Sequence, residues 1–246
     1  MENQKQTKFW NTWKHRNTYT AAIKSAGAPM GFITEEDNFA DYPFIVAPAY
    51  QLIDQKLVGK WQKYVENGGN LILTCRTGQK DKNGHFFEAN WSAPIVPLIG
   101  ADVEFFDMLV ADVNGTVKAG ENSYKWNTWA DVLNPKKGTE VLATYEDQFY
   151  KGKAAATTRK LGKGTVTYVG VESNDGDFER QIVRTIYSRA NVAIEDLPKG
   201  VFIEWRDGFY VGVNYTSEPI NLPIPKGSKI VVGQNPLQPA QAVIWK

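Results

Sequence analysis

Residues 64–78 read YVENGGNLILTCRTG, and this stretch decides the fold class. Asn67-Gly68-Gly69 is expected to end a helix, because glycine readily takes the left-handed backbone found just past helix ends. Asn70–Thr74 follows as an apolar run of strand length. Such runs are typical of strands that are buried on both faces of a parallel sheet. The stretch therefore predicts a helix-to-strand junction of an α/β domain.

The residues before this junction complete a repeating unit. Leu57, Val58, Trp61, Tyr64 and Val65 fall at helical spacing on one face, which predicts an amphipathic helix. The order strand, helix, strand with short connections indicates a βαβ unit, and so a parallel sheet with helices on its faces. Further upstream the sequence predicts three elements: a helix from about Thr7 to Ser25 that ends at Gly27, a short strand over Met30–Ile33, and a buried strand over Phe44–Ala47.

The chain becomes rich in strands after the polar loop 76–90. A second amphipathic helix then closes this region, because Phe178, Ile182, Val183, Ile186 and Tyr187 share one face. Within Tyr124–Leu133, the spacing of Trp126 and Trp129 suggests a helix or a turn. The expected strands are Val103–Phe106, Leu109–Val113, Thr116–Ala119, Val141–Tyr145, Ala154–Thr158 and Thr165–Val171.

Pro198-Lys199-Gly200 is a natural domain boundary, so we expect one domain over residues 1–197 and a second over 198–246. In the second domain, Asp207-Gly208 between two alternating runs is a strong hairpin signal. The region thus predicts a small antiparallel module, with strands over Val201–Arg206, Phe209–Tyr215 and Gln241–Trp245 and an alternating stretch from Ile220 to Ile224.

Composition narrows the range of partners. The 246 residues carry a net charge of +1, so no global field attracts nucleic acid or anionic lipid. The short basic clusters Lys136-Lys137 and Arg159-Lys160 with Lys163 are interpreted as surface charge. The N-terminus is polar and no stretch approaches the roughly 18 apolar residues of a membrane span, so we expect a soluble, cytoplasmic protein without membrane contact. The sequons at Asn90, Asn114 and Asn214 are then interpreted as chance matches.

Cys75 is the sharpest candidate for chemistry, because it follows a buried strand where a nucleophile elbow would lie. The elbow needs small flanking residues, and here Leu73 and Thr77 occupy those positions. Only His15 and His85 could serve as the base. We therefore interpret Cys75 as structural. The alternative, a Cys75-dependent amidotransferase-like hydrolase, predicts a strained backbone at position 75, a nearby histidine and a lowered thiol pKa.

The remaining chemical candidates are weaker. Asp81, His85 and Glu88 could form a loose metal cluster, but a solvated polar loop is the preferred interpretation. No carboxylate pair or phosphate-binding glycine loop stands out. We therefore assign no catalytic, cofactor-binding or metal-binding residue, and we expect no cofactor.

The eight tryptophans could form a carbohydrate-binding surface, although core or interface packing is the preferred interpretation. Trp61 and Trp205 fit the core side of their elements. Phe9, Trp10 and Trp13 lie close to a chain end, so we expect them to pack at an interface or beneath their own domain.

Several segments together resemble the glycoside hydrolase family 42 β-galactosidases. The run 42–48 resembles that family's Y-x-x-V-V-A-P strand, and 64–78 resembles its Y-V-x-x-G-G-x-L-V-L-T-x-R-S-G run. Residues 94–107 match P-x-x-x-L-L-G-x-x-V-x-E-F-D. The segments 141–145, 149–155, 162–170 and 214–216 follow in the family's order.

The resemblance implies the family's trimerisation domain, an amidotransferase-like (flavodoxin-like) α/β fold without an active site, followed by a small β-domain. The family's catalytic glutamates lie on a TIM barrel, which needs about 250 residues of its own, so no catalytic role transfers to this chain. The implied partners are copies of this chain in a trimer, or a barrel-containing glycosidase chain. The resemblance also implies a strand before the first helix. We expect rearranged N-terminal residues, a strand from another chain, or a smaller sheet.

Overall fold

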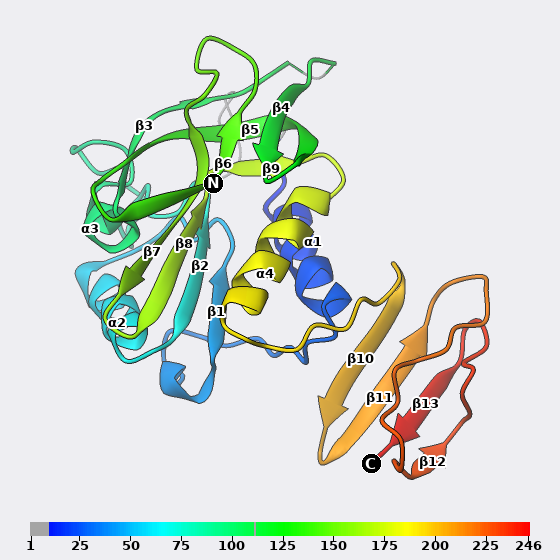
Figure 1. Cartoon of the computed structure of the whole chain (residues 1–246). Helices are drawn as coiled ribbons and strands as arrows, with labels where there is room; N and C mark the ends of the chain where they lie inside the picture. The colour runs from blue at the N-terminus through cyan, green and yellow to red at the C-terminus, as the bar shows by residue number, and fades with distance from the viewer. Residues whose placement is uncertain (1–9, 111) are drawn as a thin grey trace. The chain divides into compact units, whose positions relative to one another are not determined.

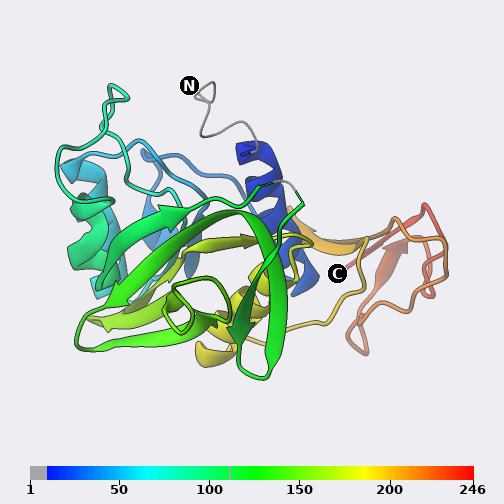
Figure 2. The same cartoon turned by 90° about the horizontal axis from the view of Figure 1, so that it is seen from above.

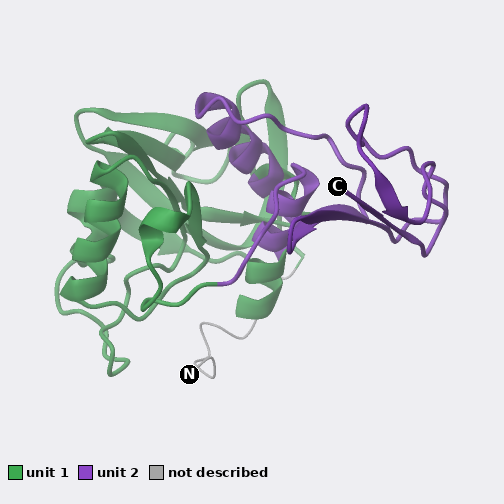
Figure 3. Cartoon of the chain, turned by 90° about the horizontal axis from the view of Figure 1, so that it is seen from below, with its two compact units in different colours: residues 1–17, 33–178 green, residues 18–32, 179–246 purple. Residues whose placement is uncertain are grey.

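The computed structural model describes residues 10–110 and 112–246, which form two compact units (Figure 3). Unit 1 comprises Met1–Asn17 and Ile33–Phe178, and unit 2 comprises Thr18–Phe32 and Glu179–Lys246. The divisions fall inside two helices, α1 (Thr12–Ser25) and α4 (Asp177–Arg189), which each contribute to both units.

Unit 1 is built on one mixed sheet (Figure 1). Among the described residues it has nine strands in the order β1-β2-β8-β7-β6-β4-β5-β3, with β9 paired to β5. Only the β1–β2 and β2–β8 pairs are parallel. The expected parallel sheet is therefore limited to three strands, and the strand-rich region continues the same sheet in antiparallel pairs. The bounds are β1 (Phe44–Ala47), β2 (Asn70–Thr74), β3 (Ala101–Asp107), β4 (Gly115–Ala119), β5 (Asn122–Pro135), β6 (Thr139–Tyr145), β7 (Ala154–Leu161), β8 (Gly164–Val169) and β9 (Val171–Ser173).

Helix α2 (Gln55–Glu66) confirms the βαβ prediction. Asp54 caps its first turn by accepting a hydrogen bond from the Leu57 amide at 2.7 Å. Its predicted apolar stripe is buried against one face of the parallel strands. At the junction only glycine fits, because a Cβ at Gly69 would lie 2.2 Å from the Tyr64 ring. The same face is covered by α3 (Val96–Ile99), which follows the short turn η3 (Ala93–Ile95); η2 (Phe39–Asp41) precedes β1.

The antiparallel strands curve strongly, as the green arch in Figure 2 shows. Register shifts in β3, β5 and β6 accompany the curvature, and such bulges bend strands. One shift lies between Trp126 and Ala130. It explains how Trp126 and Trp129, predicted to lie on a helix or turn, are both buried within strand β5.

Three sequence predictions on the N-terminal and central segments are wrong. Met30–Ile33 is not a strand, because no described strand pairs with it. Leu109–Val113 forms a loop around residue 111, which lies outside the described residues. The predicted Thr165–Val171 strand is divided at Gly170 into β8 and β9. The first helix begins at Thr12, and residues 7–9 of its predicted range lie outside the described chain. The resemblance implied a strand before the first helix. Among the described residues the sheet has no strand beyond β1 on that side.

Unit 2 contains a four-stranded antiparallel sheet, in the order β10-β11-β13-β12. Asp207, at φ +50°, and Gly208, at φ +84°, make the predicted hairpin turn. The 220–224 stretch, predicted to alternate like a strand, forms only an isolated bridge between Ile220 and Leu237. No described helix is long and apolar enough to cross a membrane. The strand bounds are β10 (Val201–Arg206), β11 (Phe209–Asn214), β12 (Ile230–Val232) and β13 (Ala242–Trp245).

Candidate functional site at the carboxyl end of strand β2

Cys75 lies directly after β2 and is completely buried. Its amide donates a hydrogen bond to the Val169 carbonyl at 2.7 Å, which continues the β2–β8 pairing past the end of the strand. The left-handed backbone falls one residue later, at Arg76, with φ +68°. A nucleophile elbow would instead place the strain on the nucleophile itself and expose its side chain. Cys75 thus occupies a structural position.

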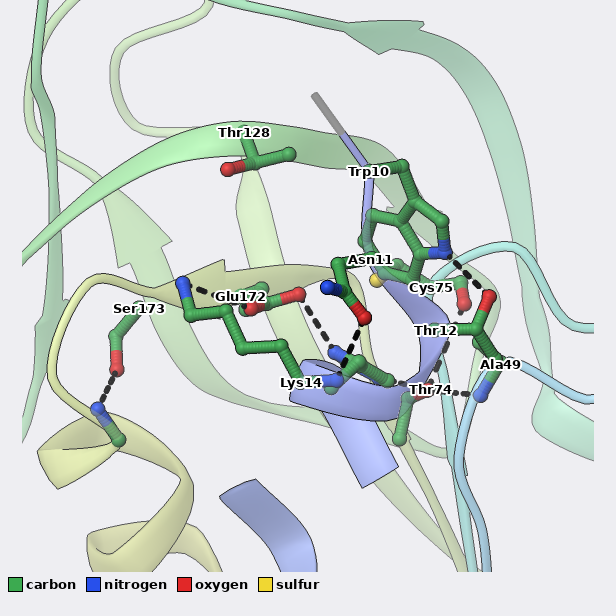
Figure 4. A network of polar contacts seen from close by, with 12 residues as sticks. Trp10, Asn11, Thr12, Lys14, Ala49, Thr74, Cys75, Thr128, Glu172 and Ser173 are labelled. Atoms are coloured by element: carbon green, nitrogen blue, oxygen red, sulfur yellow. Dashed lines mark hydrogen bonds and ion pairs between the residues drawn. The ribbon is translucent and has the colours of Figure 1, made fainter. Parts of the chain in front are cut away.

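His15 lies on α1 and is also completely buried. Its Nδ1 lies 2.9 Å from Glu172 Oε2, and its Nε2 lies 2.8 Å from Thr74 Oγ1. Thr74 Oγ1 accepts from the Ala49 amide at 2.7 Å. Both ring nitrogens of His15 are therefore engaged, one by a carboxylate and one by a hydroxyl. Figure 4 shows these contacts, together with the Lys14–Glu172 ion pair at 3.3 Å.

The order carboxylate, histidine, hydroxyl is that of a catalytic triad. A nucleophile must be reached by its substrate, however, and Thr74 has no exposed surface. The network instead joins four segments of unit 1: the first turns of α1, the end of β2, the loop after β1 and strand β9. Each hydrogen bond to a charged group of this kind is worth about 1.5–3 kcal/mol, so the network stabilises the unit.

Asp131 on β5 is the second buried carboxylate of this region. It accepts from Tyr168 Oη at 2.7 Å, Trp129 Nε1 at 2.9 Å and the Arg76 amide at 3.1 Å. Burial raises the pKa of the Asp131 carboxyl, and these hydrogen bonds oppose the rise. The Arg76 guanidinium lies 4.7 Å from the ring centroids of both Trp10 and Trp129, so two cation–π contacts accompany its burial.

The other candidates are placed away from this interior. The His85 side chain is 79% exposed, and its Nδ1 lies 3.5 Å from Asp81 Oδ2. Within residues 10–110 and 112–246, no three acidic, histidine or cysteine side chains are arranged to hold a metal ion. Asn214 is buried and its amide donates to the Glu218 and Leu237 carbonyls, so its sequon lies inside the fold.

The tryptophans are divided between core and surface. Trp61 is buried as predicted and Trp10 packs under unit 1, whereas Trp13 is 72% exposed. Trp205, predicted on the core side of its strand, is 49% exposed. It follows Val201 and Ile203 in alternation, but it lies beside the β10–β11 turn, past the end of the core.

Sequence reasoning missed Thr74, Glu172 and Asp131 as members of the interior network. A signal was available for the two acids, because each interrupts an apolar strand run: Glu172 in VGVES and Asp131 in WADVL. An acid inside a buried strand requires hydrogen-bond partners. Nothing in the sequence identified those partners, which come from distant elements.

Unit 1 is thus a mixed α/β module whose titratable groups at the end of β2 are internal and mutually bonded, and unit 2 adds a small antiparallel sheet. The model of the beta-galactosidase trimerisation domain matches residues 1–193. The chain belongs to this family, and it corresponds to the trimerisation region of the family 42 β-galactosidases.

Two curated relatives illustrate the match. Beta-galactosidase BgaH of Haloferax lucentense is 30% identical over 92% of this chain and 34% of its own length. Beta-galactosidase BglY of Alicyclobacillus acidocaldarius is 32% identical over 80% of this chain and 30% of its own length. The chain spans about a third of these relatives.

Solved structures agree in fold. The beta-galactosidase of the haloarchaeon Halorubrum lacusprofundi superposes with a TM-score of 0.89 at 25% identity, over 99% of this chain and 37% of that one. The Bacillus circulans sp. alkalophilus enzyme gives 0.86 at 20% identity, over 96% and 37%.

Proposed function

We propose that this chain is a non-catalytic assembly region of a β-galactosidase-like glycoside hydrolase, and that it associates as a homotrimer or with a barrel-containing glycosidase chain. The observation that carries the proposal is the trimerisation-domain match over residues 1–193. The interior placement of the network around Thr74, His15 and Glu172 supports it, because these groups stabilise the fold and offer no reachable nucleophile.

The two alternative functions are not supported. A Cys75-dependent hydrolase needs a reachable thiol and a free histidine. Cys75 is completely buried, and both ring nitrogens of His15 are engaged by Glu172 and Thr74. A carbohydrate-binding surface needs coplanar exposed tryptophans. The exposed ones, Trp13 and Trp205, lie on different elements, α1 and β10.

The proposal also includes the fold type and the boundary of the two domains. Residues 1–197 would form an amidotransferase-like, flavodoxin-like domain and 198–246 a separate β-domain. The parallel β1–α2–β2 unit with β8 beside it supports the first part. The apolar core of the small sheet, all but Leu197 of which lies within 198–246, supports the second. The proposal also includes a cytoplasmic location. Expression of residues 1–197 alone tests the boundary, and loss of cooperative unfolding in that fragment would contradict it.

Light scattering of the whole chain over a dilution series tests the assembly. We expect a particle of three times the 27.6 kDa chain mass that persists at low concentration. A monomer at all concentrations would contradict self-assembly, and mixing with a barrel-containing family member would then test the second partner. Labelling of Cys75 with a thiol reagent provides the check on the hydrolase alternative. We expect reaction only after unfolding, and rapid native labelling would reopen that alternative.

A further inference from the structure

We draw no further inference here: the strongest candidate, the exposed apolar edge strand β12 (Ile230–Val232) of the small sheet, carries none, because a bulge and the neighbouring Lys229 give it the usual protection of an edge strand and nothing in the described part of the structure shows what covers it.

Discussion

The large sheet of unit 1 buries ionisable side chains, whereas the small sheet of unit 2 buries the uncharged amide of Asn214. In unit 1, His15, Glu172 and Asp131 are each at most 3% exposed. His15 on α1 bonds to Glu172 on β9, and Asp131 on β5 accepts a hydrogen bond from Tyr168 on β8. In unit 2, Asn214 bonds to Thr216 and Glu218 in the turn after β11 and to the Leu237 carbonyl 23 positions away. The buried polar contacts of the large sheet therefore involve carboxylates, whereas those of the small sheet involve an uncharged amide, and removing a partner should cost more in the first.

The strongest way to break the unit 1 network is His15→Ala. It leaves Glu172 buried with the Lys14 contact at 3.3 Å and removes the ring nitrogen that lies 2.8 Å from Thr74 Oγ1. We expect a loss of about 3–5 kcal/mol in the free energy of unfolding, the usual cost of leaving a buried carboxylate without its main partner. Urea unfolding followed by tryptophan fluorescence measures it. Glu172→Gln keeps a hydrogen-bond acceptor and should cost less; an equal or larger cost would contradict the network as described.

Asn214→Ala probes the corresponding group of unit 2. The change leaves the Thr216 amide without its acceptor and removes one of two donors from the Glu218 and Leu237 carbonyls, which keep the Thr216 hydroxyl and the Ile220 amide. We expect a cost of about 1–3 kcal/mol, less than for His15→Ala, because the groups that lose a partner are uncharged. The same urea titration applies, with Thr216→Ser as a control that keeps the hydroxyl. A cost above that of His15→Ala would reverse the comparison between the units.

The smallest expected effect is a pH dependence confined to unit 1. Burial raises the folded-state pKa of Asp131 above its unfolded value of about 3.9. Its contribution to stability is therefore fully present below about pH 4 and is lost as the pH rises through the folded-state pKa. We expect Asp131→Asn, which does not titrate, to gain stability relative to wild type as the pH rises from 4 to 8. Asn214→Ala provides the control, whose difference from wild type should not change with pH. A constant difference for Asp131→Asn would show that the carboxyl is ionised throughout.

The sequence predicted well wherever the structure is set by local pattern. The α2 stripe, the Asn67-Gly68-Gly69 stop and the 201–215 hairpin follow from spacing and turn chemistry alone. The prediction was wrong at Met30–Ile33, which has the residues of a strand but no described partner to pair with. It was also wrong at Trp126 and Trp129, where a register shift in β5 produces a spacing that resembles a helix.

The βαβ start and the antiparallel end were predictable from the sequence, because periodicity and glycine placement act over a few residues. Only the tertiary structure decided that the sheet is mixed, that Cys75 is sealed inside it, and that His15 meets Glu172 across 157 positions of the chain. Strand pairing and buried polar partners depend on groups far apart in sequence, and each must satisfy its hydrogen bonds with whatever the fold brings near.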